Sequence, residues 1–141
     1  MSATLGDGAF RLDHNEPALN VVKPGEVHDT TTPRAMLGDL DRLLLGSALS
    51  KTSRERLTGW VVANQTGGER LRAGLPRDWR VGDKTGSWSG AVSNDIAIMW
   101  PPGRPPILAV GFVTAPGSTS TQRDAALAAV GRAIAEAAGR G

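Results

Sequence analysis

Three stretches in the second half of the chain carry the hydrophobic patterns of β-strands. Residues 79–85 alternate between two faces, and a second alternating run, residues 96–100, follows a turn rich in Ser and Gly. Because side chains two residues apart share one face of a strand, this pattern predicts a hairpin that ends at Pro101-Pro102. Residues 107–114 are short and continuously apolar, which is typical of a central strand.

Helical patterns flank these strands. Thr32 is a good N-cap and Pro33 suits the first helical position, so a helix is predicted to start there. A second helix is predicted to start at a capping box, residues 52–55, and to end before Gly67. A final amphipathic helix is predicted over residues 121–138. The apolar positions of the first two helices are Met36, Leu40, Leu43, Leu44, Leu57, Trp60 and Val61.

The order helix, helix, strand, strand, strand, helix predicts an α+β fold with a three-stranded antiparallel sheet. The sheet carries more apolar residues than the last helix alone can cover, and Trp60 and Trp79 are expected in the core. With 141 residues and 40% hydrophobic content the chain can bury one modest core, so a single domain is expected.

Residues 9–34 form a long loop, because they hold three prolines and show no regular periodicity. Loops of this length in compact domains are usually functional or disordered. Apolar residues within the loop predict that it packs against the rest of the chain. These residues are Leu12, Leu19, Val21 and Val22.

Composition excludes several classes of function. Sixteen Lys and Arg stand against fourteen Asp and Glu, and the basic residues are scattered. With four Trp, two Phe and no Tyr, the chain lacks an aromatic and basic platform, so no nucleic-acid partner is expected. The absence of Cys removes disulfides and thiolate chemistry. No apolar run reaches membrane-spanning length and no signal-peptide core follows Met1, so no membrane insertion is expected and the compartment stays open.

Candidate chemistry lies at the end of the first predicted strand, in Lys84-Thr85-Gly86. The lysine ammonium attracts a carboxylate, the threonine hydroxyl supplies a directed hydrogen bond, and the glycine lets a ligand approach the backbone. The backbone N–H of Ser87 would be free to meet an oxyanion. The alternative for so short a motif is an ordinary exposed lysine before a turn.

The loop also holds His14 and His28, which lie beside several carboxylates and invite a metal or acid–base interpretation. Their spacing matches no recognisable zinc pattern, so no metal site is predicted. Ser-His-Asp catalysis is conceivable from composition, but no signal places a serine on a nucleophile elbow.

Three segments in the same order closely resemble the class A serine β-lactamases. They are RLDHNEPALN (residues 11–20), DTTTPRAM (29–36) and GDKTG (82–86), and the resemblance runs from about Leu5 to the C-terminus. The loop segment argues against a penicillin-binding transpeptidase, which shares the Lys-Thr-Gly strand but lacks the glutamate loop. The resemblance implies a partial β-lactamase/penicillin-binding-like fold with no cofactor. Its expected parts are an omega-loop region (1–34), a helical part (35–68) and a sheet with the C-terminal helix (69–141), within one partial catalytic domain (1–141).

The resemblance implies that Glu16 is a general base. It would activate the water that hydrolyses an acyl-enzyme, Asn20 would hold that water, and the Glu16–Pro17 bond would be cis. The alternative is a solvated loop glutamate.

The resemblance further implies that the Lys84 triplet binds the substrate carboxylate and that the Ser87 backbone forms half of an oxyanion hole. Arg70 stands where some members carry an arginine that helps the lysine hold this carboxylate. The alternative for Arg70 is a surface arginine before a strand.

The chain departs from the family at several places. His14 replaces an arginine that usually pairs with the aspartate aligned with Asp29, and a His–Asp pair weakens above the imidazole pKa near 6.5, so a looser loop and an altered substrate range are expected. Trp88 replaces a small residue at the site mouth. The Ser-x-x-Lys nucleophile motif and the Ser-Asp-Asn motif do not occur in the 141 residues.

The leading hypothesis is therefore the C-terminal half of a β-lactam-hydrolysing serine enzyme, an activity that underlies antibiotic resistance. Its partners would be a β-lactam substrate and the N-terminal half of the same fold, and it would be inactive alone. The alternative is a non-catalytic module that binds carboxylates or complements a fragment, or a degenerate remnant. The family is secreted or periplasmic.

Overall fold

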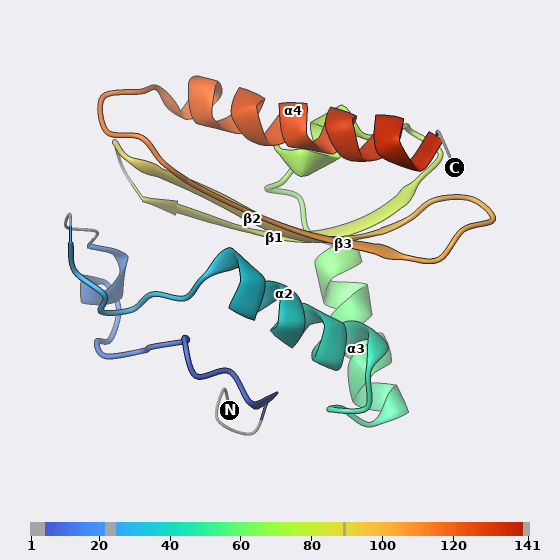
Figure 1. Cartoon of the computed structure of the whole chain (residues 1–141), viewed down its shortest axis with the longest axis horizontal. Coiled ribbons are helices and arrows are strands. Elements are labelled where there is room, and N and C mark those ends of the chain that lie inside the picture. The colour runs from blue at the N-terminus through green and yellow to red at the C-terminus, as the bar shows by residue number, and fades with distance from the viewer. Residues whose placement is uncertain (1–4, 22–24, 89, 140–141) are drawn as a thin grey trace.

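The computed structural model describes residues 5–21, 25–88 and 90–139. Its centre is an antiparallel sheet of three strands in the order β1 (Arg80–Trp88), β2 (Val92–Trp100) and β3 (Ile107–Thr114). The long helix α4 (Ser120–Gly139) covers one face of the sheet, and the helices α2 (Pro33–Leu40) and α3 (Lys51–Val62) lie on the other (Figure 1). The predicted α+β fold with an antiparallel sheet is confirmed.

Two apolar clusters hold these three layers together, one on each face of the sheet. The cluster beneath α4 is buried around Leu71, Val81 and Met99, and Trp79 packs against it as expected. The cluster beneath α2 and α3 is buried around Leu40, Leu44 and Ile98. Trp60 belongs to neither buried set. It is 66% exposed on α3, so its predicted place in the core is wrong.

The hairpin is longer than the hydrophobic pattern predicted. β1 continues through the Lys84 triplet as far as Trp88, and β2 begins at Val92, four residues before the predicted start. Lys84 faces Ile96 across the ladder, and Thr85 faces Asp95. The triplet therefore lies inside a paired strand, where the ladder fixes its backbone.

The helix starts follow capping chemistry, with one correction. The Thr32 side chain accepts a hydrogen bond from Ala35 N at 3.1 Å, which confirms the predicted start of α2. This helix continues into a π-helical turn, η2 (Asp41–Leu45). The predicted capping box at 52–55 is wrong, because Ser50 caps α3 through a 3.2 Å bond from Ser53 N.

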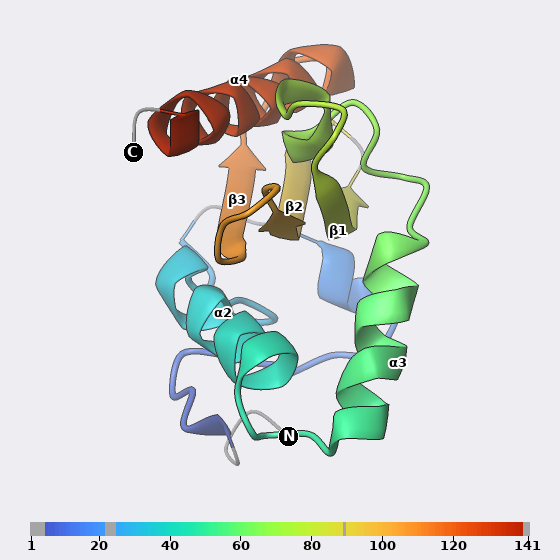
Figure 2. The ribbon, with the colours of Figure 1, turned by 90° about the vertical axis from the view of Figure 1, so that its right-hand side faces the viewer.

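A short connector joins α3 to the sheet and packs on α4. It contains the 3-10 turn η3 (Leu71–Gly74), which faces α4 (Figure 2). A Cβ atom at Gly131 of α4 would lie 2.2 Å from the Leu71 carbonyl oxygen, and one at Gly74 would lie 2.1 Å from the Ala128 oxygen. Only glycine fits such a close approach of two backbones.

The N-terminal segment is the predicted long loop, with one 3-10 turn, η1 (Ala18–Asn20). Leu12 and Val21 are 66% and 48% exposed, so the prediction that they pack is wrong for these two. Leu19 is half-buried, and Val22 lies outside the described residues. Among the helices that the structure describes, none has both the length and the apolar character that a membrane crossing requires.

Candidate functional site

The first part of the candidate site is the exposed end of β1. Lys84 is exposed, and its Nζ donates a 2.7 Å hydrogen bond to the Thr85 carbonyl oxygen. The Thr85 hydroxyl shares a hydrogen bond with the Thr66 hydroxyl. The position of a Cβ on Gly86 has no closer neighbour than the Asn94 side chain, at 3.7 Å. Because β1 is an edge strand, part of its backbone is free to meet a ligand.

A buried carboxylate supports this strand from behind. The Asp83 side chain is fully buried, and it accepts hydrogen bonds from Arg72 Nε at 3.0 Å, from Arg72 Nη2 and from Asn64 Nδ2. A Cβ on Gly67 would overlap the same carboxylate. These contacts hold Asp83 directly before Lys84 in the chain. They lie on the face of β1 that also carries Val81.

Asp95, the cross-strand neighbour of Thr85, is a second buried carboxyl. Its Oδ2 accepts the Leu71 N–H at 3.2 Å, and its Oδ1 has no hydrogen-bond partner among the described residues. Burial, together with the negative charge of Asp83, raises the pKa of Asp95 to about 7. A titratable acid therefore lies directly behind the predicted carboxylate-binding strand.

Arg70 is not the surface arginine of the alternative interpretation, because it is only 7% exposed. Its Nε donates to Asp124 Oδ1 at 2.9 Å, and its Nη1 donates to the carbonyl oxygens of Gly86 at 3.0 Å and Asn94 at 2.6 Å. Its Nη2 donates to Ser87 Oγ at 2.6 Å. The guanidinium thus joins α4 to both strands of the hairpin and orients the Ser87 hydroxyl.

A pocket of about 420 Å³ opens beside Ser87. Trp88, which is 36% exposed, is one of the residues that line it. Arg70 and Arg123 also line this pocket, and Arg123 is 5% exposed and donates to Ser118 O at 2.6 Å. Two buried guanidinium groups therefore border the end of β1, and Asp124 balances the charge of one of them, Arg70.

The structure also brings together the two loop residues predicted to handle water. Asn20 Nδ2 donates a hydrogen bond to Glu16 Oε2, and the Glu16–Pro17 peptide bond is cis, as the resemblance implied. Glu16 is exposed. The N-terminal loop, blue in Figures 1 and 2, lies on the same side of the sheet as α2 and α3. No hydrogen bond or ion pair joins the Glu16 and Lys84 groups in the described part of the chain.

An apolar groove of about 520 Å³ lies next to the lysine of β1. It is formed by residues of α2, η2, α3, β1 and β2, and all of its lining is apolar except Asn64 and Lys84. The residues that line it are Met36, Leu40, Leu43, Leu44, Leu57, Trp60, Val61, Asn64, Lys84 and Ile96. An exposed apolar surface of this kind, bordered by polar groups, is typical of an interaction site.

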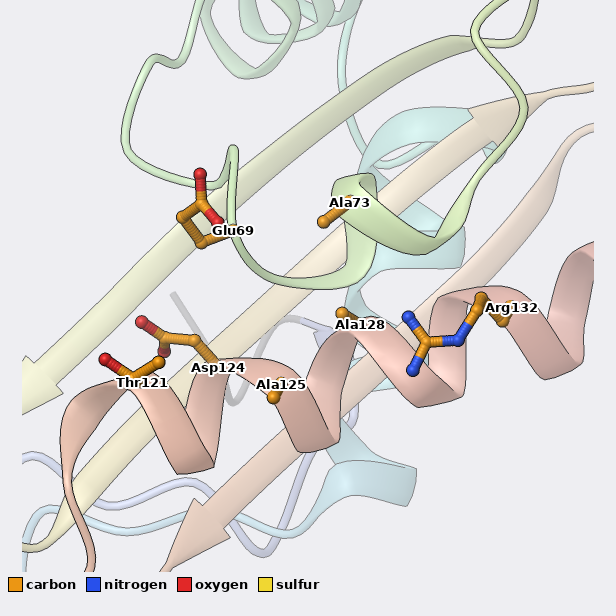
Figure 3. A pocket seen from close by; sticks show the side chains of 7 residues that line it. All are labelled: Glu69, Ala73, Thr121, Asp124, Ala125, Ala128 and Arg132. Carbon is orange, nitrogen blue, oxygen red and sulfur yellow. The ribbon is translucent and has the colours of Figure 1, made fainter.

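A further pocket, of about 450 Å³, lies between the connector and α4 (Figure 3). Glu69, Thr121 and Asp124 border one end, and Arg132 lies at the other. It contains none of the predicted site residues. In the described ranges, no group of three His, Asp or Glu side chains is arranged to hold a metal ion.

The fold is similar to solved structures of class A β-lactamases. An ancestral class A β-lactamase has a TM-score of 0.93 with 53% sequence identity, over 96% of this chain and 52% of that chain. A β-lactamase from Xanthomonas campestris pv. campestris has a TM-score of 0.92 with 50% identity, over 95% of this chain and 50% of that chain. The chain therefore has part of the α+β fold of the class A β-lactamases.

The sequence comparisons give the family. The model of the β-lactamase enzyme family matches residues 3–138, and the chain belongs to this family. It is 46% identical to the β-lactamase CTX-M-8 of Citrobacter amalonaticus over 132 residues, which are 94% of this chain and 45% of that protein. It is 45% identical to a β-lactamase of Streptomyces albus G, over 96% of this chain and 43% of that protein. The chain spans about half the length of the curated relatives it matches.

Proposed function

We propose that this chain supplies the deacylation base and the carboxylate-binding strand of a β-lactam-hydrolysing serine site. The acylating serine would come from the N-terminal half of the same fold. The observation that carries the proposal is the pairing of Glu16 with Asn20 in a chain whose relatives are β-lactamases. The Lys84 triplet on an edge strand is the second support.

The apolar groove is the surface that we assign to the N-terminal half. Its aliphatic walls and the 66% exposed Trp60 would be buried by such a partner, which would be covalently continuous with this chain or separate. Burying one large apolar side chain contributes roughly 1.5–3 kcal/mol, so a groove of this composition favours association strongly. Lys84 lines the same groove, so the partner would meet the end of β1.

The proposed reaction divides the chemistry between the two halves. A serine of the N-terminal half attacks the lactam carbonyl carbon, the ring C–N bond breaks, and the hydroxyl proton passes to the ring nitrogen. The serine then carries the acyl group as an ester. Glu16 takes a proton from a water molecule held by Asn20, and the water oxygen attacks the ester carbonyl. The Ser87 N–H stabilises the negative charge on the carbonyl oxygen. The serine oxygen then leaves, and the proton returns to it through Glu16.

Lys84 and the Thr85 hydroxyl would hold the carboxylate of the substrate during both steps. Four N–H groups of Arg70 already donate to its own chain. Its contribution would therefore be mainly to keep the Ser87 segment in place, with its positive charge adding to the field at the carboxylate.

The test is the variant Glu16→Gln, mixed with a separately supplied N-terminal half of a class A β-lactamase and a penicillin. Mass spectrometry should find the acyl group accumulated on the serine of the partner, because the water is no longer activated. Glu26→Gln, which replaces a second carboxylate of the same loop, is the matched control. In this variant the acyl-enzyme should still be hydrolysed. If Glu16→Gln turned over the substrate at the rate of the control, Glu16 would not be the deacylation base.

A non-catalytic module that binds carboxylates is the second candidate, favoured by the two buried guanidinium groups beside Ser87. It predicts that a penicillin binds the chain alone in calorimetry and that Glu16→Gln leaves this binding unchanged. Acyl-enzyme formation in the mixture would exclude a purely binding role.

A further inference from the structure

The pocket of about 420 Å³ beside Ser87 is lined by a buried arginine whose charge has no carboxylate to balance it in the described part of the chain. Arg123 lies in the first turn of α4 and is 5% exposed. Its Nη1 donates to the Ser118 carbonyl oxygen at 2.6 Å and to Ser118 Oγ at 3.1 Å, and its Nε donates to Ser93 Oγ at 3.3 Å. All three acceptors are neutral. None of the ion pairs among the described residues includes Arg123.

One nitrogen of this guanidinium is left for a ligand. Arg123 Nη2 has no acceptor among the described residues, and it is not completely buried. It can therefore donate to a group that enters the pocket. A buried charge is costly unless an opposite charge or several hydrogen bonds compensate it. The guanidinium thus favours an anionic ligand over a neutral one.

The rest of the pocket wall adds no negative charge, because no Asp or Glu of the described chain lines it. The second charged residue of the wall is Arg70, whose Nε lies 2.9 Å from Asp124 Oδ1. Two positive charges against this one negative charge leave one positive charge at the pocket. That remaining charge belongs to Arg123.

Two hydroxyl groups of the wall can add hydrogen bonds to an anion. Ser87 Oγ accepts from Arg70 Nη2 at 2.6 Å, and Ser93 Oγ accepts from Arg123 Nε. Since each oxygen accepts from an arginine and donates to no described group, its own hydrogen is left for a ligand. The positive end of α4 lies here too, because Ser120, the first residue of this 20-residue helix, is part of the wall.

We propose that this pocket is a binding site for a small oxyanion, with Arg123 as the main source of positive charge. The N–H groups of Arg123 Nη2 and the hydroxyls of Ser87 and Ser93 suit a ligand with several oxygens, such as sulfate, phosphate or a carboxylate. Lys84 is not part of this wall, and its side chain lines the apolar groove instead. The oxyanion would therefore be bound in addition to the carboxylate that we assign to Lys84.

Two sources have this chemistry. One is a free inorganic oxyanion, and the other is an acidic substituent of a β-lactam whose ring carboxylate lies at Lys84. Only the second source rests on the proposed function. Binding in the pocket requires no hydrolysis, so a failed anion site and a failed catalytic role are distinguishable.

Sulfate is the probe, because its charge is constant around neutral pH. The whole chain is titrated with sodium sulfate in exchange for sodium chloride at constant ionic strength, and NMR follows the Nε–H signal of Arg123 and the indole N–H signal of Trp88, which lines the pocket. Both signals should shift and saturate together in the millimolar range, while the indole signal of Trp60 on α3 should not move. An absent shift, or one that rises without saturation, would overturn the site.

Variants locate the bound anion. Arg123→Gln removes the unbalanced charge and should weaken sulfate binding by about tenfold or more, as expected for hydrogen bonds to a charged group. Arg132→Gln, which removes an arginine of the same helix outside this pocket, is the matched control and should bind sulfate like the wild type. Lys84→Gln should bind it equally well. Loss of binding in Lys84→Gln, with binding retained in Arg123→Gln, would place the anion at Lys84 and overturn the proposal.

A second substitution covers the case in which Arg123→Gln does not fold, as judged by circular dichroism. Arg123→Lys keeps the charge but lacks the Nη2 donors, and it should weaken sulfate binding several-fold. Wild-type affinity in the folded Arg123→Lys variant would contradict the role of Nη2.

Competition identifies the source of the oxyanion. A penicillin with a second carboxylate on its side chain is titrated into the wild-type chain with and without saturating sulfate, beside a penicillin that has only the ring carboxylate. If the substituent fills the pocket, sulfate should weaken the binding of the first penicillin alone. If the pocket takes a free oxyanion, sulfate should leave the binding of both unchanged. Weaker binding of both penicillins would place sulfate at the position of the ring carboxylate and would overturn the proposal.

Discussion

Asp95 gives the sharpest quantitative prediction, because its carboxyl is fully buried beside Asp83 and has a pKa of about 7 in the folded chain, against an ordinary value of 3.8. The folded state binds this proton more tightly than the unfolded state does. The contribution of Asp95 to the free energy of unfolding is therefore highest below pH 4 and falls as the pH rises towards 7. At about 1.4 kcal/mol per pKa unit, the full loss is about 4 kcal/mol.

The variant Asp95→Asn removes this loss, since an amide has nearly the same shape and does not ionise. Its carbonyl oxygen can still accept the Leu71 N–H. Between about pH 5 and pH 8 the wild-type free energy of unfolding should fall by about 2–3 kcal/mol more than that of the variant. Such a difference is a large fraction of the stability of a small domain.

Urea unfolding, followed by Trp fluorescence at the two pH values, measures both free energies. Asp78→Asn removes one negative charge from an exposed turn before β1 and controls for the change in net charge. Parallel pH dependence in the wild type and Asp95→Asn would refute the reasoning, because it would mean that the carboxyl behind Thr85 titrates alike in the folded and unfolded chains.

Three further predictions concern stability and the site. Gly131→Ala should destabilise the chain by about 1–3 kcal/mol in urea unfolding because its Cβ overlaps the Leu71 oxygen, whereas Gly59→Ala, in open space on α3, should be neutral or stabilising. Thr32→Ala should cost about 1 kcal/mol in the same assay through the lost cap of α2, and an unchanged midpoint would contradict the cap. Arg70→Lys should lower turnover by the complemented protein by about tenfold or more, because a lysine cannot make the fork of bonds to both strands; wild-type kcat and KM would contradict this role.

The sheet and the Lys84 triplet could be predicted because their signals are local. Alternation over residues 79–85 fixes a strand and its two faces, and a turn of Ser and Gly followed by a second alternating run fixes the hairpin. The same alternation places Asp83 on the inner face beside Val81, which was the available signal for a buried carboxylate. Its partners Arg72 and Asn64 are 11 and 19 residues away in sequence, and nothing local identifies them.

Other errors come from choices that only the tertiary structure makes. Ser50 and Thr52 are both competent N-caps, and α3 uses Ser50. Trp60 falls on a helix face with Leu57 and Val61, but this face exceeds what the described chain covers, so Trp60 remains exposed. The buried position of Arg70 depends on Asp124, which lies 54 residues further along the chain.

The most direct test of the central claim is the hydrolysis of a chromogenic cephalosporin by the purified chain, with and without a separately supplied N-terminal half of a class A β-lactamase. The account predicts hydrolysis in the mixture and none by the chain alone, with Trp60 fluorescence shifting to the blue as the groove is covered. Hydrolysis by the chain alone would contradict it, because a nucleophile would then lie within these 141 residues. A mixture that associates and stays inactive would contradict the assignment of Glu16 and Lys84 to a hydrolytic site.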